Sequence, residues 1–502
     1  MGEQKKKISL SALILMIFTT IFGFGNPPVA FEQMGYGAIF WYILGAVLFF
    51  IPSGLMFAEY GSSFKEAKGG IYSWLEKSIG ETWAFIATFM WLASWIVWMV
   101  MIAQKIWITV ATIFSGHDTT GSWSLFGLNS TLTLGLLAVV WMVGTTWAAT
   151  KGLNTLTKVS SVGGIAVMLM NVILLVSSVV ILIANHGHLA QPVQHLSDFA
   201  LSPSSQFQTP IALISFMVYA VFAYGGLESL GGVTDSLKNP EKTFPKAIMI
   251  SGVIIAVGYS LSIFLWGIST NWQSVIVGQH ANLGNIVYVM MQNLGYELGK
   301  SLGMSLHASA LLGAGFSRFA GIGMLLAYIG SFFVITYSPL KSFILGSPKE
   351  LWPEKLTKLN ENGMPANAMW LQAIIVIIFA GGISILAAIT HKEATFFYNV
   401  LTSMSNVSTT IPYLFLVAAF PFFKAKKDID RPFEVYHSKR WMKFIVCVTL
   451  FTIGIGNFFT ILTPFITNDL FTGLWTLAGP ILFGLIAWGF LKRRERNKHL
   501  NL

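Results

Sequence analysis

The sequence predicts an all-α polytopic membrane protein with twelve transmembrane helices, and three observations lead to this fold class. Of the 502 residues, 54% are hydrophobic and only 10% are charged, whereas a typical soluble domain carries about 25% charged residues. Apolar stretches of about the length that crosses a bilayer, ~20 residues, recur along the whole chain. The single cysteine, Cys447, excludes an intrachain disulfide framework and a thiolate metal cluster. We therefore predict one transmembrane transporter domain over residues 1–502.

Twelve apolar stretches bounded by charged or turn residues give the predicted helices. The third and the eighth are long enough to be tilted. The first is too long for a cleaved signal peptide and is followed by further spans. The twelve stretches are residues 10–31, 37–58, 82–113, 131–149, 159–184, 209–232, 247–269, 311–346, 367–390, 396–420, 442–466 and 471–491.

The distribution of Lys and Arg orients these helices. With the N-terminus in the cytoplasm, most of the 31 basic residues fall in cytoplasmic segments, which is the bias that membrane proteins show. Both termini are therefore predicted to lie inside, and the formal net charge of +10 has the same origin. Nucleic-acid binding is rejected as the other explanation of this charge, because the basic residues are spread among short loops.

The first stretch contains a break in its helix-forming sequence. Gly23, Gly25 and Asn26 are followed by the pair Pro27 and Pro28 inside an apolar run. Proline removes a hydrogen bond within a helix but suits the first turn of a helix that restarts. We therefore predict an interruption at residues 23–25.

The sixth stretch contains the second break. Gly225, Gly226 and the carboxylate of Glu228 stand within an otherwise apolar run. Glycine is common in membrane helices for close packing alone, which explains either cluster taken by itself. The first and sixth stretches, however, each open a unit of five spans, and an odd number of spans inverts the second unit relative to the first. The matching positions favour a binding site formed by both breaks.

This spacing predicts an architecture of two inverted repeats, residues 10–184 and 209–420, followed by two peripheral helices at 442–491. Interrupted helices expose backbone groups at mid-membrane. A helix that restarts after Gly25 presents free N–H groups, which suit a carboxylate, and the ends of the preceding half-helices present carbonyls, which suit an ammonium. An amino acid zwitterion matches both.

These residues resemble the amino acid, polyamine and organocation (APC) superfamily of permeases. Beyond the two breaks, the resemblance rests on residues 69–74 (GGIYSW), 91–95 (WLASW) and 239–248 (NPEKTFPKAI), and it runs through most of the chain. Within the superfamily the chain is most similar to the glutamate:GABA antiporter branch. The resemblance implies a LeuT-like fold with discontinuous helices 1 and 6, in a bacterial inner membrane.

Carried over residue by residue, the resemblance implies roles for both breaks. The backbone N–H groups near Phe24, Gly25 and Asn26 would hold the substrate carboxylate. The carbonyls of Ile21, Phe222 and Gly225 would hold the ammonium, with Phe222 also as an aromatic gate. The other substrate-binding residues are Gly23, Ala223, Tyr224 and Gly226 in the breaks and Ala93, Ser94 and Trp98 in the third span.

The sequence departs from the family pattern in three ways. The bulky Phe24 and the stiff pair Pro27 and Pro28 leave the side-chain specificity open. The fifth stretch has no ionisable residue where some relatives keep a Lys, which argues against a Lys-dependent coupling step.

Ionisable residues inside membrane spans are costly and mark functional candidates. Glu228 lies beside the second break and is interpreted as a gate or a proton carrier, with capping of the restarted helix as the alternative. Arg318 lies about two turns into the eighth stretch and reads an anionic side chain or snorkels to the interface. For Lys105 we favour snorkelling.

The predicted function is secondary-active transport by alternating access, as an antiporter that exchanges an amino acid for a related amino acid or its decarboxylated amine. Proton-coupled symport through Glu228 stays open, and an ion channel is a distant alternative. Residues 295–301 resemble a P-loop but are one residue too short between the glycines. We predict no enzyme activity, no cofactor and no metal site. The expected partners are the amino acid or amine and the lipid bilayer, without nucleic acid, and a homodimer stays open.

Overall fold

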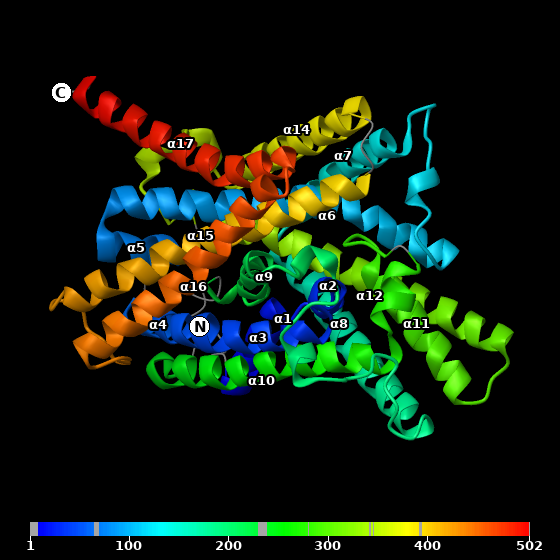
Figure 1. Ribbon diagram of the computed structural model, residues 1–502. Coiled ribbons are helices and arrows are strands. Elements are labelled where there is room, and N and C mark those ends of the chain that lie inside the picture. The colour runs from blue at the N-terminus through cyan, green and yellow to red at the C-terminus, as the bar shows by residue number, and fades with distance from the viewer. Residues whose placement is uncertain are drawn as a thin grey trace, which may run out of the picture.

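The computed structural model consists of long helices packed side by side (Figure 1). It describes residues 9–64, 70–228, 238–279, 281–340, 343–344, 346–390 and 394–500. Within these ranges the regular structure is helical and contains no strand, so the predicted all-α class is confirmed.

The described residues of the first half of the chain form eight α-helices. A 3-10 turn at Gly35–Gly37 and a π-helical turn at Ala46–Phe50 join three of them into one helical run of 38 residues, Asn26–Ser63. The boundary between the first two predicted stretches, residues 32–36, contains the end of α2, where Gly35 has φ +55° and a 3-10 turn follows. The eight helices are α1 (Leu10–Ile21), α2 (Asn26–Met34), α3 (Ala38–Gly45), α4 (Ile51–Ser63), α5 (Ile71–Ile79), α6 (Glu81–Ser115), α7 (Ser130–Ala149) and α8 (Leu153–Ala184).

Nine further α-helices lie in the part of the second half that the structure describes. One of them, Ile286–Ser301, falls outside every predicted stretch because its buried apolar residues alternate with Gln, Asn and Glu at helical spacing. The nine helices are α9 (Pro210–Ala223), α10 (Pro240–Ser269), α11 (Ile286–Ser301), α12 (Leu306–Leu340), α13 (Glu354–Thr357), α14 (Ala366–Thr390), α15 (Ala394–Ala425), α16 (Lys439–Ile466) and α17 (Leu470–Leu500).

Ten helical segments of the described chain are long and apolar enough to cross a membrane. The predicted first and sixth spans are not among the ten in their predicted form. The first is divided, so that α1 has only 12 residues, and α9 has only 14. The number twelve therefore stays a prediction, while the class of a multi-span membrane protein is confirmed.

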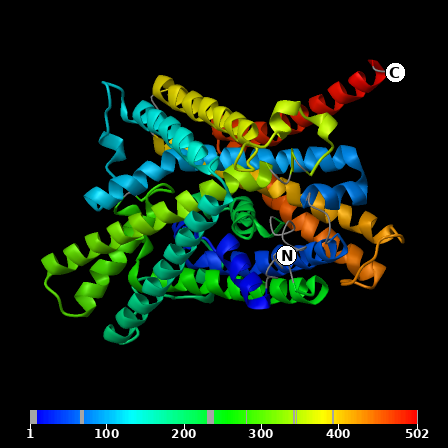
Figure 2. The same ribbon diagram turned by 180° about the vertical axis from the view of Figure 1, so that it is seen from behind.

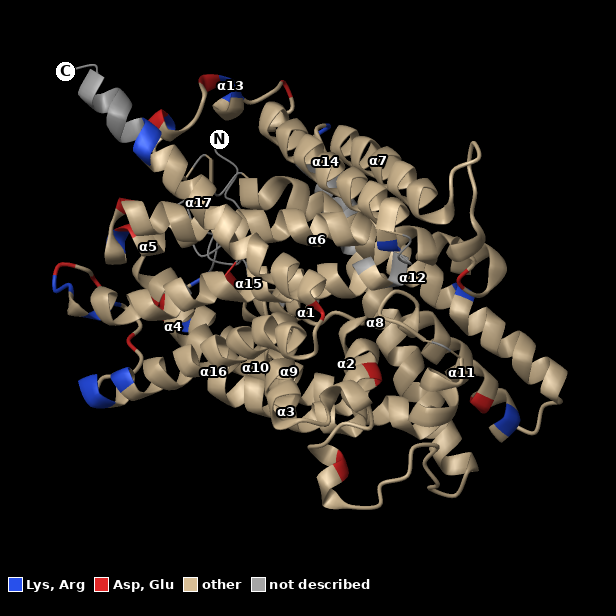
Figure 3. Cartoon of the chain, turned by 45° about the horizontal axis from the view of Figure 1, so that its top comes forward, with Lys and Arg blue, Asp and Glu red and all other residues tan. Residues whose placement is uncertain are grey.

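The surface of the bundle matches this class. Charged residues gather mostly at its two ends and leave a broad uncharged zone between them (Figure 3). Large apolar side chains such as Ile165 on α8, Ile378 on α14 and Leu485 on α17 are more than half exposed. Lipid chains cover such side chains at no cost, because they are as apolar as the side chains themselves.

Helix packing places α10 beside the interrupted helices. It lies along α1, α3 and α4 (Figure 1). On the opposite side of the breaks, α15 packs against α6, α9 and α16. Seen from behind, α12 crosses α8 (Figure 2). The two breaks thus lie between α10 and α15.

Candidate functional site

The first break lies between α1 and α2. The last bond of α1 runs from Phe22 N–H to Phe18 O at 2.8 Å, and Asn26 N–H closes a tight turn onto Gly23 O at 3.1 Å. Pro27 and Pro28 follow in the first turn of α2, where a missing N–H costs nothing. Within the described chain, the N–H groups of Phe24 and Gly25 donate no hydrogen bond. The break therefore presents two free donors side by side.

The second break begins where α9 ends. Gly225 N–H donates to Phe222 O at 2.9 Å, so that carbonyl already has one partner. Gly226 has φ +115°, which a residue with a Cβ rarely adopts. A Cβ there would also lie 3.3 Å from Thr20 Cγ2 and 3.8 Å from Ile21 Cγ1. The second break thus packs against the end of α1, and the rest of the predicted sixth stretch, residues 229–232, lies outside the described residues.

Tyr259 of α10 connects the two breaks, and the sequence did not single it out. Its hydroxyl lies 2.7 Å from Ile21 O and 3.0 Å from Ala223 O, the last carbonyls of α1 and α9. It also accepts from Gly23 N–H at 3.2 Å and from Asn26 Nδ2 at 3.0 Å. In sequence it is an unremarked tyrosine in an apolar helix, and its contacts span up to 238 residues.

Glu228 is buried and fully engaged by donors. Trp91 Nε1 donates to Oε1 at 3.0 Å, while the Tyr413 hydroxyl and Gly226 N–H donate to Oε2 at 2.5 and 3.1 Å. These donors come from α6, α15 and the break itself. The carboxylate therefore stabilises the bend at Gly226, which is what a cap does.

Comparison with known proteins decides the family to which this bundle belongs. The family model described as amino acid permease matches residues 8–488. The chain belongs to the amino acid permease family. This confirms the resemblance to the APC superfamily that the sequence motifs indicated, and it makes the protein a transporter and not an enzyme.

Relatives match this permease over nearly its whole length. The inner membrane transporter YjeM of Salmonella typhimurium is 48% identical, over 97% of this chain and 96% of its own. The aspartate/glutamate permease AcaP of Lactococcus lactis is 25% identical, over 87% and 83% of the two chains. The probable agmatine/putrescine antiporter AguD of the same species is 25% identical, over 98% and 96%. The permease is thus an integral membrane protein with relatives in a bacterial inner membrane.

Three aromatic residues of the breaks were also predicted to belong to the site, and each packs against another aromatic ring. Phe24 is buried, with its ring edge-on to Trp266 at a centroid distance of 6.0 Å. Tyr224 is buried against Phe50 at 4.7 Å, and its hydroxyl donates to Tyr42 O at 2.9 Å. Phe222 is only partly buried and stacks on Tyr219 at 6.3 Å. Of these three aromatic rings, only that of Phe222 is partly exposed, and its role as a gate stays a prediction.

The predicted third-span residues of the permease point in different directions from α6. Ala93 packs in an apolar cluster with Met404 of α15 and Phe483 of α17. Ser94 is buried, and its hydroxyl donates to Trp91 O at 2.7 Å on its own helix. Trp98 is partly buried, 5.6 Å from the Phe332 ring of α12. The resemblance therefore grouped residues that the helix distributes over several faces.

Arg318 lies at the end of α6 and not at the breaks. Its Nη2 donates to Phe114 O at 3.4 Å, and Nη1 donates to Ala314 O on its own helix at 3.3 Å. A cation at the C-terminal end of a helix is favourable, because that end carries partial negative charge. Lys105 similarly donates to Leu283 O at 2.6 Å. Both cations thus bind backbone carbonyls.

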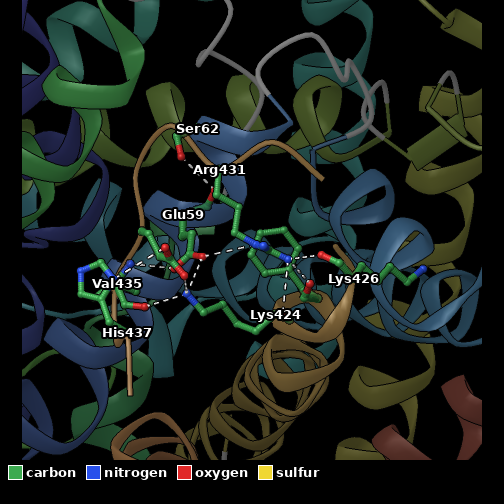
Figure 4. Close-up of polar contacts among 9 residues, drawn as sticks. Glu59, Ser62, Lys424, Lys426, Arg431, Val435 and His437 are labelled. Carbon is green, nitrogen blue, oxygen red and sulfur yellow. Dashed lines mark hydrogen bonds and ion pairs between the residues drawn. The ribbon is translucent and has the colours of Figure 1, made fainter. Parts of the chain in front are cut away.

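A second polar cluster joins α4, α15 and the segment that follows α15 (Figure 4). We call it the Glu59 cluster, and its core is the fully buried carboxylate of Glu59 on α4. Lys424 Nζ of α15 lies 3.0 Å from Glu59 Oε1 and 2.8 Å from Glu434 Oε1, and Val435 N–H donates to Glu59 Oε2 at 2.8 Å. The hydrogen bond from Lys424 lowers the pKa of the Glu434 carboxyl. The segment after α15 is therefore fastened to α4 by charge.

Proposed function

We propose that this permease exchanges an amino acid for a related amino acid or its decarboxylated amine by alternating access. The observation that carries the proposal is the pair of free N–H groups at Phe24 and Gly25, close in sequence to the carbonyl of Ile21 at the end of α1. Free donors at a restarting helix suit a carboxylate, and carbonyls at a helix end suit an ammonium. One break thus offers groups for both ends of a zwitterion.

The proposal includes the architecture in which this site works. We place residues 10–184 and 209–420 as two inverted five-helix repeats, with two peripheral helices at 442–491 and both termini in the cytoplasm. The support is that helix breaks begin the two proposed units and lie against each other at Gly226 and Thr20.

Exchange is favoured over other modes of transport by two of the relatives. AguD is named a probable agmatine/putrescine antiporter, and a glutamate/gamma-aminobutyrate antiporter of Lactococcus lactis is 25% identical over 92% of this chain. Exchange also needs no proton carrier at the site, and Glu228 is bound by three donors. Proton-coupled symport is the second candidate, because Glu228 is a carboxylate beside the break.

Counterflow into proteoliposomes tests the function. Vesicles loaded with one unlabelled compound are diluted into its labelled form, for a panel of the twenty amino acids and their decarboxylated amines. We expect saturable accumulation that requires internal solute and is insensitive to a protonophore. Accumulation driven by a pH gradient without internal solute would favour symport. Flux that does not saturate would indicate a channel and contradict the proposal.

A further inference from the structure

The Tyr259 hydroxyl lies within hydrogen-bonding distance of four groups and cannot bond all four at once. A hydroxyl has one hydrogen to donate and two lone pairs to accept with. Gly23 N–H and Asn26 Nδ2 are donors and occupy both lone pairs. The single hydrogen then stands between two carbonyl oxygens, Ile21 O at 2.7 Å and Ala223 O at 3.0 Å. Only one of the two carbonyls receives it at any moment.

The oxygen itself is fixed, so the hydrogen is the part that moves. The Tyr259 ring is fully buried, stacked on Phe22 at 4.6 Å and tilted against Tyr42 at 4.9 Å. Phe22 in turn fits because Gly258 lacks a side chain, since a Cβ there would lie 2.9 Å from the Phe22 ring. Rotation about the bond between ring and oxygen redirects the hydrogen without moving any other atom.

The two carbonyls belong to different broken helices. Ile21 O is the end of α1, and Ala223 O is the end of α9. Burying a carbonyl without a donor costs about 1 to 3 kcal/mol, so the carbonyl that lacks the hydrogen gains from any other donor. If an ammonium group donates to Ile21 O, the hydroxyl hydrogen is free to turn to Ala223 O. Each of the two carbonyls then has a donor.

We propose that Tyr259 is a positioning residue whose hydroxyl hydrogen turns from Ile21 O to Ala223 O when a substrate ammonium binds at Ile21. This inference rests on the proposed function, because it requires an ammonium-bearing substrate at the first break. Binding at the first break thereby strengthens the tie to the second. The hydroxyl transfers no proton to the substrate, because only its direction changes.

The variant Tyr259→Phe tests this role, because it keeps the ring and its packing and removes only the hydroxyl. Counterflow is measured with the panel compound that wild-type protein exchanges fastest. We expect the apparent affinity to fall about threefold to tenfold, the size of one neutral hydrogen bond, because Ile21 O loses the group that positions it. The maximum rate should change much less. In detergent, a fixed concentration of that compound should raise the melting temperature less than in wild type.

A matched control is Tyr60→Phe, which also removes a buried tyrosine hydroxyl that donates to a backbone carbonyl, Leu416 O at 3.2 Å. It should lower the melting temperature without changing the apparent affinity. If Tyr259→Phe does the same, the positioning role is wrong and the hydroxyl is structural. Wild-type protein that exchanges no panel compound would instead overturn the proposed function, and this inference with it.

A second variant keeps the test decisive if Tyr259→Phe does not fold. Asn26→Ala removes one donor to the hydroxyl and leaves its hydrogen and both carbonyls in place. The oxygen is then held less firmly, so the apparent affinity should fall in the same direction by a smaller factor. An unchanged affinity in Asn26→Ala would contradict the proposal.

Discussion

At the scale of single residues, Gly25 and Gly226 differ in what an added side chain would meet. A Cβ at Gly25 would lie 3.5 Å from Met324 Cε, an ordinary contact, and its φ of −73° suits any residue. At Gly226 the φ is +115° and the nearest side-chain carbon is at 3.3 Å. Gly25→Ala should therefore fold normally yet exchange about tenfold more slowly, because the methyl group crowds the free N–H groups. Gly226→Ala should lose about 1 to 3 kcal/mol of stability.

The two glycine variants are compared by melting temperature and by counterflow at equal amounts of reconstituted protein. Gly25→Ala with wild-type exchange would remove the first break from the substrate site. Gly226→Ala with a wild-type melting temperature would show that the backbone at the second break relaxes without strain.

Both carboxylate oxygens of Glu228 accept hydrogen bonds, so a neutral amide at this position cannot satisfy the same donors. In Glu228→Gln one oxygen becomes an NH₂ group, which would face either Trp91 Nε1 or the pair Tyr413 and Gly226 N–H. The Tyr413 hydroxyl can turn to accept, but Trp91 Nε1 and Gly226 N–H can only donate. Whichever of these two faces the NH₂ group loses its acceptor, so we expect a stability loss of about 1 to 3 kcal/mol and weaker transport in both exchange and net modes. The melting temperature and the two flux modes measured across pH 5 to 8 check this, with the exposed Glu350→Gln as control.

A proton-carrying Glu228 would give a different result. The Gln variant would then keep exchange and lose only the uptake that a pH gradient drives, because exchange never requires the empty carrier to reorient. Retained exchange at a wild-type melting temperature would therefore contradict the capping role.

At the scale of helices, the Glu59 cluster fastens α4 to the segment that follows α15. Lys424→Met would leave the fully buried Glu59 carboxylate without its nearest cation, while Arg431 Nε stays 3.8 Å away. Removing one partner of a buried ion pair costs about 3 to 5 kcal/mol, so we expect a clearly lower melting temperature. The control Lys358→Met removes an ion pair of the exposed residues Lys358 and Glu354 and should leave the melting temperature unchanged. Equal effects of the two variants would mean that burial adds nothing at Glu59.

Helices and their ends were predictable where the sequence marks them locally, by an uninterrupted run of apolar residues or by a cluster of glycine and proline. The glycines and prolines at 23–28 indicated where α1 ends and α2 restarts, because both residue types act through the local backbone. The amphipathic α11 was missed because its apolar residues are interrupted. Arg318 was a candidate for substrate recognition, and only the fold places it at the end of α6.

At the scale of the whole molecule, the contacts that define the site join residues far apart in sequence. Trp91 and Tyr413 bind Glu228 across 137 and 185 residues, and Tyr259 reaches Ile21 across 238. Tyr259 and Tyr413 are aromatic residues in apolar helices like many others, and the motif that contains Trp91 does not point to Glu228. The sequence could therefore indicate the breaks and the charged residue, while the groups that hold them in place required the fold.

The orientation of the bundle follows from charge alone and needs a direct test. The basic residues predict that the loop at Ser122 lies outside and the loop at Glu361 lies in the cytoplasm, and both side chains are exposed. Ser122→Cys and Glu361→Cys are each made in a Cys447→Ala background, so that each variant carries one cysteine. A membrane-impermeant thiol reagent applied to intact cells should label Ser122→Cys and leave Glu361→Cys unlabelled until the membrane is opened. Labelling of Glu361→Cys in intact cells, with Ser122→Cys protected, would reverse the predicted sidedness and place the Glu59 cluster on the outer face.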